Sequence, residues 1–197
     1  MKRLILATVL GGMAAFIWGA IAHMATPIAS AGFSSLPAEK EATFRRQLAE
    51  VVPADGLYFY PWVDPASEES VREAWARQIE TGPSGLLVYH PAREGAFSPL
   101  LYIRQFGFDL VAALGAALLV SRLRGNRLCR AAGASTMGFF AFLAISAPHW
   151  NWYGFPAAFV LAAGVDVVVK SFVLGLVAAV LIPSKSEGTA TDRITSA

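Results

Sequence analysis

The chain has 197 residues, of which 55% are hydrophobic and 15% are charged, and its formal net charge is +2. Charged residues make up about 25% of an ordinary soluble domain, so the composition excludes a disordered chain, and the weak net charge does not support nucleic-acid binding. The single cysteine, Cys129, excludes an internal disulfide framework.

The apolar residues are gathered into four runs, each long enough to cross a bilayer as a helix, which takes about 20 residues. We expect membrane helices at residues 4–31, 100–121, 131–148 and 155–183. The first run follows Lys2 and Arg3 and ends in an A-x-A-like sequence, which also fits a signal peptide. Because the apolar part of a signal peptide is only about 7–15 residues long, the length of this run favours a retained helix.

A polar insert at residues 32–99 separates the first two runs and is expected to form a small α+β or helical unit. Apolar spacing predicts a helix between Pro37 and Pro53, and a second helix that starts at Asp64–Pro65. Residues 57–63 and 86–89 are predicted strands. The unit is small for independent stability, so it should rest on the membrane or on a partner. Its aromatic residues form either a docking surface or its own core: Tyr58, Phe59, Tyr60 and Trp62.

The distribution of Lys and Arg predicts the orientation of the chain in the membrane. With both termini in the cytoplasm, the cytoplasmic segments carry eight basic and two acidic residues, a net charge of +6. The insert carries six basic and ten acidic residues, a net charge of −4. We therefore expect cytoplasmic termini, an insert on the outer side, and a disordered cytoplasmic tail at residues 184–197.

Small residues repeated every four positions predict where the helices pack closely. The first helix carries such a stripe, and the third and fourth helices each carry a shorter one: Gly11, Ala15, Gly19, His23 and Pro27; Ala134 and Gly138; Gly175 and Ala179.

No nucleotide-binding, metalloprotease, serine-hydrolase or CxxC motif is present, so we identify no catalytic residue, no metal site and no cofactor. Ionisable residues inside the membrane runs are a better guide to function, because each is unfavourable unless it is paired or hydrated. Asp166 and Lys170 lie four residues apart in the last run and are expected to form an ion pair. That pair would either specify helix packing or take part in a proton or ion relay.

The expected topology also places polar residues from several spans near the outer interface: His23, Arg104, Asp109, His149 and Asn151. As one cluster they could bind a metal, a lipid headgroup or a quinone. As separate residues they would form hydrogen bonds with water and headgroups at the interface.

Four segments resemble a family of bacterial four-span inner-membrane proteins with no assigned activity: W-G-A-I-A-H at 18–23, G-L-Y-F-Y-P at 56–61, G-L-L-V-Y-H-P at 85–91 and N-W-Y-G-F-P at 151–156. The resemblance implies the bacterial cytoplasmic (inner) membrane and a periplasmic insert. It implies no catalytic residue.

We therefore expect an all-α polytopic membrane protein that acts as a non-enzymatic accessory or structural subunit of a larger membrane complex. One alternative is a small transporter or lipid-handling protein that uses the Asp166–Lys170 pair. Another is a membrane-embedded enzyme with a site at the outer interface. The expected partners are membrane lipids and other membrane-protein subunits or a second copy of the chain, with no nucleic acid.

Overall fold

The computed structural model describes residues 1–93, 95 and 97–184. The chain divides into two units, one formed by Met1–Phe33 with the chain from Phe97 onward, and the other by Ser34–Ala96. Apart from Ser184, the predicted tail at residues 184–197 lies outside the described residues.

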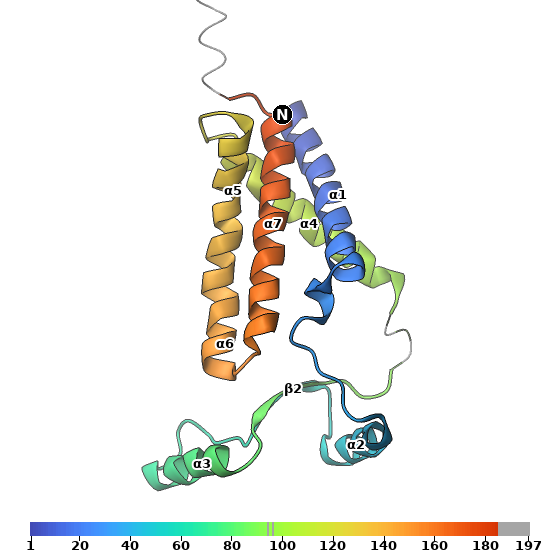
Figure 1. The fold of residues 1–197 in the computed structure, drawn as a ribbon, viewed down its shortest axis with the longest axis vertical. Coiled ribbons are helices and arrows are strands. Elements are labelled where there is room, and N and C mark those ends of the chain that lie inside the picture. The colour runs from blue at the N-terminus through green and yellow to red at the C-terminus, as the bar shows by residue number, and fades with distance from the viewer. Residues whose placement is uncertain (94, 96, 185–197) are drawn as a thin grey trace, which may run out of the picture. The chain divides into compact units, whose positions relative to one another are not determined.

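The first unit is a bundle of long helices (Figure 1). Its elements are α1 (Lys2–Ala25), the short 3-10 helix η1 (Pro27–Ser30), α4 (Pro99–Val120), α5 (Arg127–Ala141), the π-helical turn η2 (Phe142–Ser146), α6 (Ala147–Tyr153) and α7 (Ala157–Leu181). Four helical stretches are long and apolar enough to cross a membrane, because α5, η2 and α6 run on as one stretch over Arg127–Tyr153. The fold is thus mostly helical with four candidate membrane spans, as the sequence predicted.

The ends of the four helices all differ from the predicted residues, and the difference is largest for the first and third. The first ends at Ala25 rather than at residue 31, because Pro27 follows and lacks the N–H that the helix needs. The third continues past residue 148 to Tyr153, so the expected connector is largely helical. The π-helical turn η2 widens the helix just before Pro148, and Gly154 ends it with a φ of +68°.

Small residues form the contacts between the helices of this bundle. A Cβ atom added to Gly175 would lie 2.4 Å from Cβ of Ala134, and one added to Gly138 would lie 2.5 Å from the carbonyl oxygen of Val167. The predicted small-residue faces of the third and fourth helices therefore do pack on each other, as α5 against α7. On α1, Gly11 is buried against α4, whereas Gly19 has no atom within 4 Å of an added Cβ among the described residues.

The second unit contains two helices and a two-stranded antiparallel sheet, so it is α+β. Its elements are α2 (Ala38–Val51), β1 (Gly56–Tyr60), α3 (Glu69–Thr81) and β2 (Gly85–Tyr89). The strands pair from Gly56 opposite Tyr89 to Tyr60 opposite Gly85. The first strand is shorter than predicted because Pro61 cannot donate to a sheet.

The predicted start of the helix after this strand was wrong. Asp64 does not cap α3, which begins five residues later at Glu69. Instead, the carboxylate of Asp64 accepts a hydrogen bond from the backbone N–H of Ala66 at 2.8 Å and closes a local turn. The indole N–H of Trp75 on α3 donates to the carbonyl oxygen of Pro61 at 2.8 Å.

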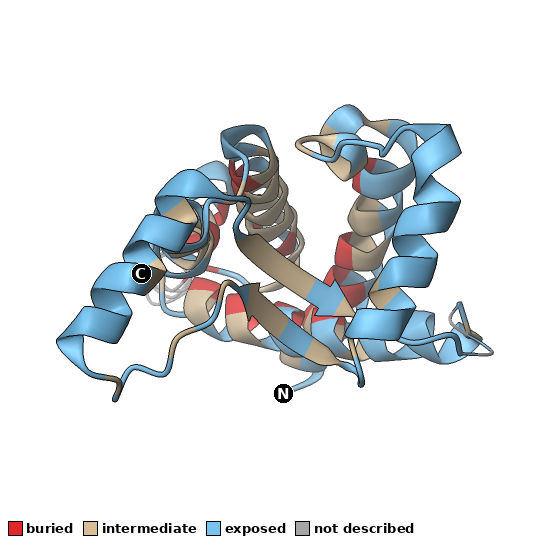
Figure 2. Ribbon diagram, turned by 90° about the horizontal axis from the view of Figure 1, so that it is seen from below, coloured by how far each residue is buried: buried red, intermediate tan, exposed pale blue. Residues whose placement is uncertain are grey.

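The second unit has no closed core. None of its described residues is buried, and in Figure 2 its two strands are coloured as intermediate or exposed. Tyr58 and Phe59 are only half-buried, and Tyr60 and Trp62 are 47% and 69% exposed. The four aromatic residues therefore do not form the core that was one of the two interpretations of the sequence.

Candidate functional site

Six polar side chains from three helices of the bundle form two sets of contacts, which are connected through α7 because Asp166 and Lys170 lie four residues apart on that helix. We call the two sets together the mid-helix polar cluster: Trp18, His23 and Asp166 form one set, and Gln105, Asp109 and Lys170 form the other. Asp109 lies ten residues and Asp166 nine residues after the first residue of its helix. At 1.5 Å per residue these positions are about 15 Å and 14 Å along the helix axes, half the thickness of a bilayer core.

Asp166 is held by two residues of α1. The indole N–H of Trp18 donates to Oδ1 of Asp166 at 2.7 Å, and Nε2 of His23 lies 3.6 Å from Oδ2. The side chain of Asp166 is 17% exposed and that of His23 is 57% exposed. Oδ1 of Asp166 thus accepts a short hydrogen bond, while Oδ2 lies near a histidine whose side chain is mostly exposed.

Asp109 is the most deeply buried acidic group of the cluster. Its side chain is 4% exposed, its Oδ1 lies 3.6 Å from Nζ of Lys170, and the amide of Gln105 donates to the same oxygen at 3.2 Å. Its second oxygen, Oδ2, is buried and has no hydrogen-bond partner among the described residues. Because the N–H···O hydrogen bonds of proteins are usually 2.7–3.2 Å long, Lys170 compensates the charge of Asp109 without a tight hydrogen bond.

The expected ion pair between Asp166 and Lys170 has different partners in the structure. Lys170 pairs with Asp109 on α4, and Asp166 pairs with His23 on α1. Spacing by four residues places both side chains along one side of α7, but α1 and α4 each pack against that helix. Side chains from the neighbouring helices therefore take the places that the local pair would have filled.

The five residues expected near the outer interface do not form one cluster. No hydrogen bond or ion pair in the described part of the chain joins any two of them. His23 and Asp109 belong to the mid-helix polar cluster, whereas the ring of His149 stacks on Phe155 at 5.2 Å between centroids. Arg104 and Asn151 are exposed. His149 thus lies outside the contacts that an enzyme site with His23 and Asp109 would need.

The described residues contain no group of three His, Cys, Asp or Glu side chains that could hold a metal ion. The carboxylates, the amine and the imidazole of the cluster are groups that can carry charge and exchange protons. Trp18 and His23 contact Asp166, and Asp109 contacts Lys170, which lies about one helical turn further along α7.

No family model, no curated protein and no solved structure matches this chain. The resemblance to a bacterial four-span membrane family therefore stays a prediction from the quoted segments. Any function of the chain has to be argued from its own residues.

Arg130 joins the ends of two helices, although the sequence predicted it only as one of the basic residues on the cytoplasmic side. It is 2% exposed. Its guanidinium donates to the carbonyl oxygen of Val120 at the end of α4 and to those of Ala179 and Ile182 at the end of α7. The last carbonyls of a helix have no partner within it. The sequence places Arg130 close to the end of the second span, but it does not show that this side chain is buried or that it reaches the end of α7.

Trp18 was not predicted as a member of the cluster, and Gln105 was predicted only as a polar residue near the outer interface, beside Arg104 and Asp109. The indole N–H of a tryptophan within a membrane helix needs an acceptor, and Gln105 lies four residues before Asp109. Both features point to polar neighbours, but neither identifies which helix supplies them.

Proposed function

We propose that this protein is a non-enzymatic accessory subunit of a larger complex in the bacterial inner membrane. In this proposal both termini are cytoplasmic, and residues 34–96 form a periplasmic domain that binds another membrane protein. The charge distribution supports that orientation, with a net charge of +6 on the segments assigned to the cytoplasm and −4 on the insert.

The absence of a buried core in the described residues of the insert carries this proposal. A two-stranded ribbon is at best marginally stable in water, and it needs further strands or packing against a helix. Neither α2 nor α3 contains a buried residue. The ordered elements of this domain would therefore gain most of their burial from a binding partner.

The insert has an apolar groove in which part of that burial can occur. The groove has a volume of about 560 Å³ and lies between α2 and the ribbon, where Phe44, Leu48, Val51, Tyr58 and Leu87 line it. Among the described residues that line it, none is charged. A groove with this lining suits an apolar helix of a partner protein, which would bury its apolar side chains there.

Isolation of the tagged full-length protein from its own membranes in mild detergent tests this proposal. We expect a species heavier than the 21.0 kDa chain, with a second protein at fixed stoichiometry. A photo-crosslinking residue at position 51 should link to that second protein. The Phe44→Ser/Val51→Ser variant should lose the partner, because it places two hydroxyl groups in the groove.

Val71→Ser is the matched control, since Val71 is 47% exposed on α3 and does not line the groove. This variant should retain the partner. Equal loss of the partner in both variants would contradict recognition through the groove. A species that contains only this chain would contradict the accessory-subunit proposal and would indicate self-association or a stand-alone protein.

We propose proton conduction through the bundle as a second candidate function, and Oδ2 of Asp109, which has no hydrogen-bond partner among the described residues, favours it. A buried carboxylate in a membrane helix is costly, and such groups occur in proton and ion pathways. His23 gives the cluster an imidazole at its edge with 57% of the side chain exposed, and imidazoles act as proton shuttles in proteins.

Proteoliposomes with an internal pH-sensitive dye test this second candidate. Under an imposed membrane potential, the wild-type protein should carry protons, and Asp109→Asn and Asp166→Asn should abolish the flux. Asp64→Asn, which removes an exposed carboxylate in the insert, should leave the flux unchanged. Absence of flux through the wild-type protein would contradict this candidate function.

A further inference from the structure

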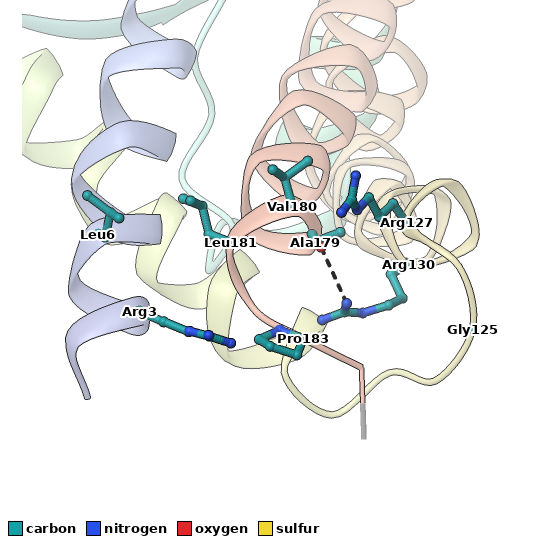
Figure 3. A pocket seen from close by; sticks show the side chains of 9 residues that line it. All are labelled: Arg3, Leu6, Gly125, Arg127, Arg130, Ala179, Val180, Leu181 and Pro183. Atoms are coloured by element: carbon teal, nitrogen blue, oxygen red, sulfur yellow. Dashed lines mark hydrogen bonds between the residues drawn. The ribbon is translucent and has the colours of Figure 1, made fainter. Parts of the chain in front are cut away.

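A second pocket lies at the end of the bundle where α1 begins and α7 ends (Figure 3). It has a volume of about 330 Å³. Three arginines from two helices line it: Arg3 on α1, and Arg127 and Arg130 on α5. The described residues that line it include no carboxylate.

Arg130 lines this pocket and forms hydrogen bonds with the backbone around it. Its buried guanidinium holds the last carbonyls of α4 and α7 together through its bonds to Val120, Ala179 and Ile182. The C-terminal ends of helices carry partial negative charge, and Arg130 offsets that charge at both helices. The hydrogen bonds to these helix ends come from Arg130, and Arg3 and Arg127 make none of them.

Arg3 and Arg127 are exposed, and neither forms an ion pair with a residue that the structure describes. Arg127 is also the first residue of α5, a helix of 15 residues, so the partial positive charge of that helix N-terminus adds to the potential of the pocket. The site is therefore suited to an anion with several acceptor oxygens, which arginine binds in bidentate geometry.

The lining of the pocket also includes apolar side chains. Leu6, Val180 and Leu181 lie beside the arginines in the same pocket. A free inorganic anion would make no use of these residues, whereas a lipid offers a phosphate and acyl chains next to each other. Basic pockets between membrane helices at the cytoplasmic side bind the headgroups of anionic lipids.

We propose that this pocket binds the phosphate of an anionic phospholipid through Arg3 and Arg127, with the acyl chains along Leu6 and Val180. The site is separate from the groove of the insert. Failure of this inference would therefore leave the proposed partner binding untouched, and the reverse also holds.

Native mass spectrometry of the full chain with phosphatidylglycerol or phosphatidylcholine tests the inference. We expect phosphatidylglycerol to be retained in preference to phosphatidylcholine. The Arg3→Gln/Arg127→Gln variant should bind phosphatidylglycerol roughly tenfold to a hundredfold more weakly, because each lost hydrogen bond to a charged group corresponds to about tenfold in affinity. Both side chains are exposed, and the thermal midpoint of the variant would show that its fold is retained.

Arg122→Gln/Arg124→Gln is the matched control, since it removes two exposed arginines from the connector between α4 and α5 outside the pocket. It should bind phosphatidylglycerol as the wild type does. Equal weakening in both double variants would overturn the inference, because it would show only general attraction between a basic surface and an anionic lipid.

Two further arms test other sources of the same anionic chemistry. Inorganic phosphate should not displace the lipid at equal concentration, and complete displacement would overturn the assignment of the site to a lipid. The segment at residues 185–197 carries Glu187 and Asp192. A chain that ends at Ser184 should bind phosphatidylglycerol as the full chain does. If only the shortened chain binds the lipid, the segment itself fills the pocket and the inference is overturned.

Discussion

Asp109 and Lys170 form an ion pair between two membrane-length helices. A buried carboxylate is unfavourable, and an amine from a neighbouring helix reduces this penalty. Lys170 lies 3.6 Å from Asp109 and is itself only 22% exposed. Removal of one partner therefore leaves an uncompensated charge, whereas removal of both charges leaves none.

We predict that Lys170→Met lowers the free energy of unfolding by about 3 kcal/mol, because Asp109 would remain buried without a cation. The Asp109→Asn/Lys170→Met double variant should regain most of this loss. Denaturant unfolding in detergent micelles measures both values, and a double-mutant cycle isolates the coupling between the two side chains. Additive losses in the cycle would show that the two residues do not interact.

Helix packing in this protein depends on where small residues meet. Gly138 on α5 faces the backbone of α7, because an added Cβ would lie 2.5 Å from the carbonyl oxygen of Val167 and 2.8 Å from Cα of Val168. Backbone atoms cannot move aside as a flexible side chain can. By contrast, Gly19 on α1 has open space at that position among the described residues.

We predict opposite effects of the same substitution at these two glycines. Gly138→Ala should lower the free energy of unfolding by about 1–3 kcal/mol, because α5 and α7 must separate to admit the methyl group. Gly19→Ala should raise it by about 0.5–1 kcal/mol, because alanine loses less backbone entropy in a helix. Thermal unfolding of the two variants in the same detergent checks both signs. Equal destabilisation would contradict the packing of α5 on α7.

The two units of the molecule differ in how deeply their described residues are buried. The helix bundle buries small residues, an ion pair and an arginine, whereas the described residues of the insert contain no buried position. The four candidate spans and the uneven distribution of basic residues together predict that the two ends of the bundle face different compartments.

Cys129 provides a direct test of this orientation, because it is the single cysteine of the chain and it is exposed. We predict that a membrane-impermeant maleimide labels Cys129 in inverted membrane vesicles and not in right-side-out vesicles. In a Cys129→Ser/Ser84→Cys variant, which moves the thiol to an exposed position in the insert, the pattern should reverse. Labelling of both positions from the same side would contradict the proposed topology.

Helix content, the four candidate spans and the close-packed faces of α5 and α7 could be predicted from the sequence, although Gly19 in the predicted stripe of α1 has no close neighbour among the described residues. These features depend on local properties, namely the length of an apolar run and the spacing of small residues along one helix. Local rules also predicted two strands in the insert and the small-residue faces that carry Ala134 and Gly175, but not that the strands pair or that these two residues meet. They misplaced helix ends where Pro27 and the π-helical turn before Pro148 intervene.

Only the tertiary structure decided which polar groups meet. Asp166 and Lys170 share one side of α7, but their partners come from α1 and α4, and Arg130 joins the ends of two helices that are far apart in the sequence. Hydropathy and spacing describe one helix at a time, whereas the partner of a buried charge depends on which neighbouring helix faces it. Local patterns therefore determined the helices, and the packing between helices determined the mid-helix polar cluster and the arginine pocket.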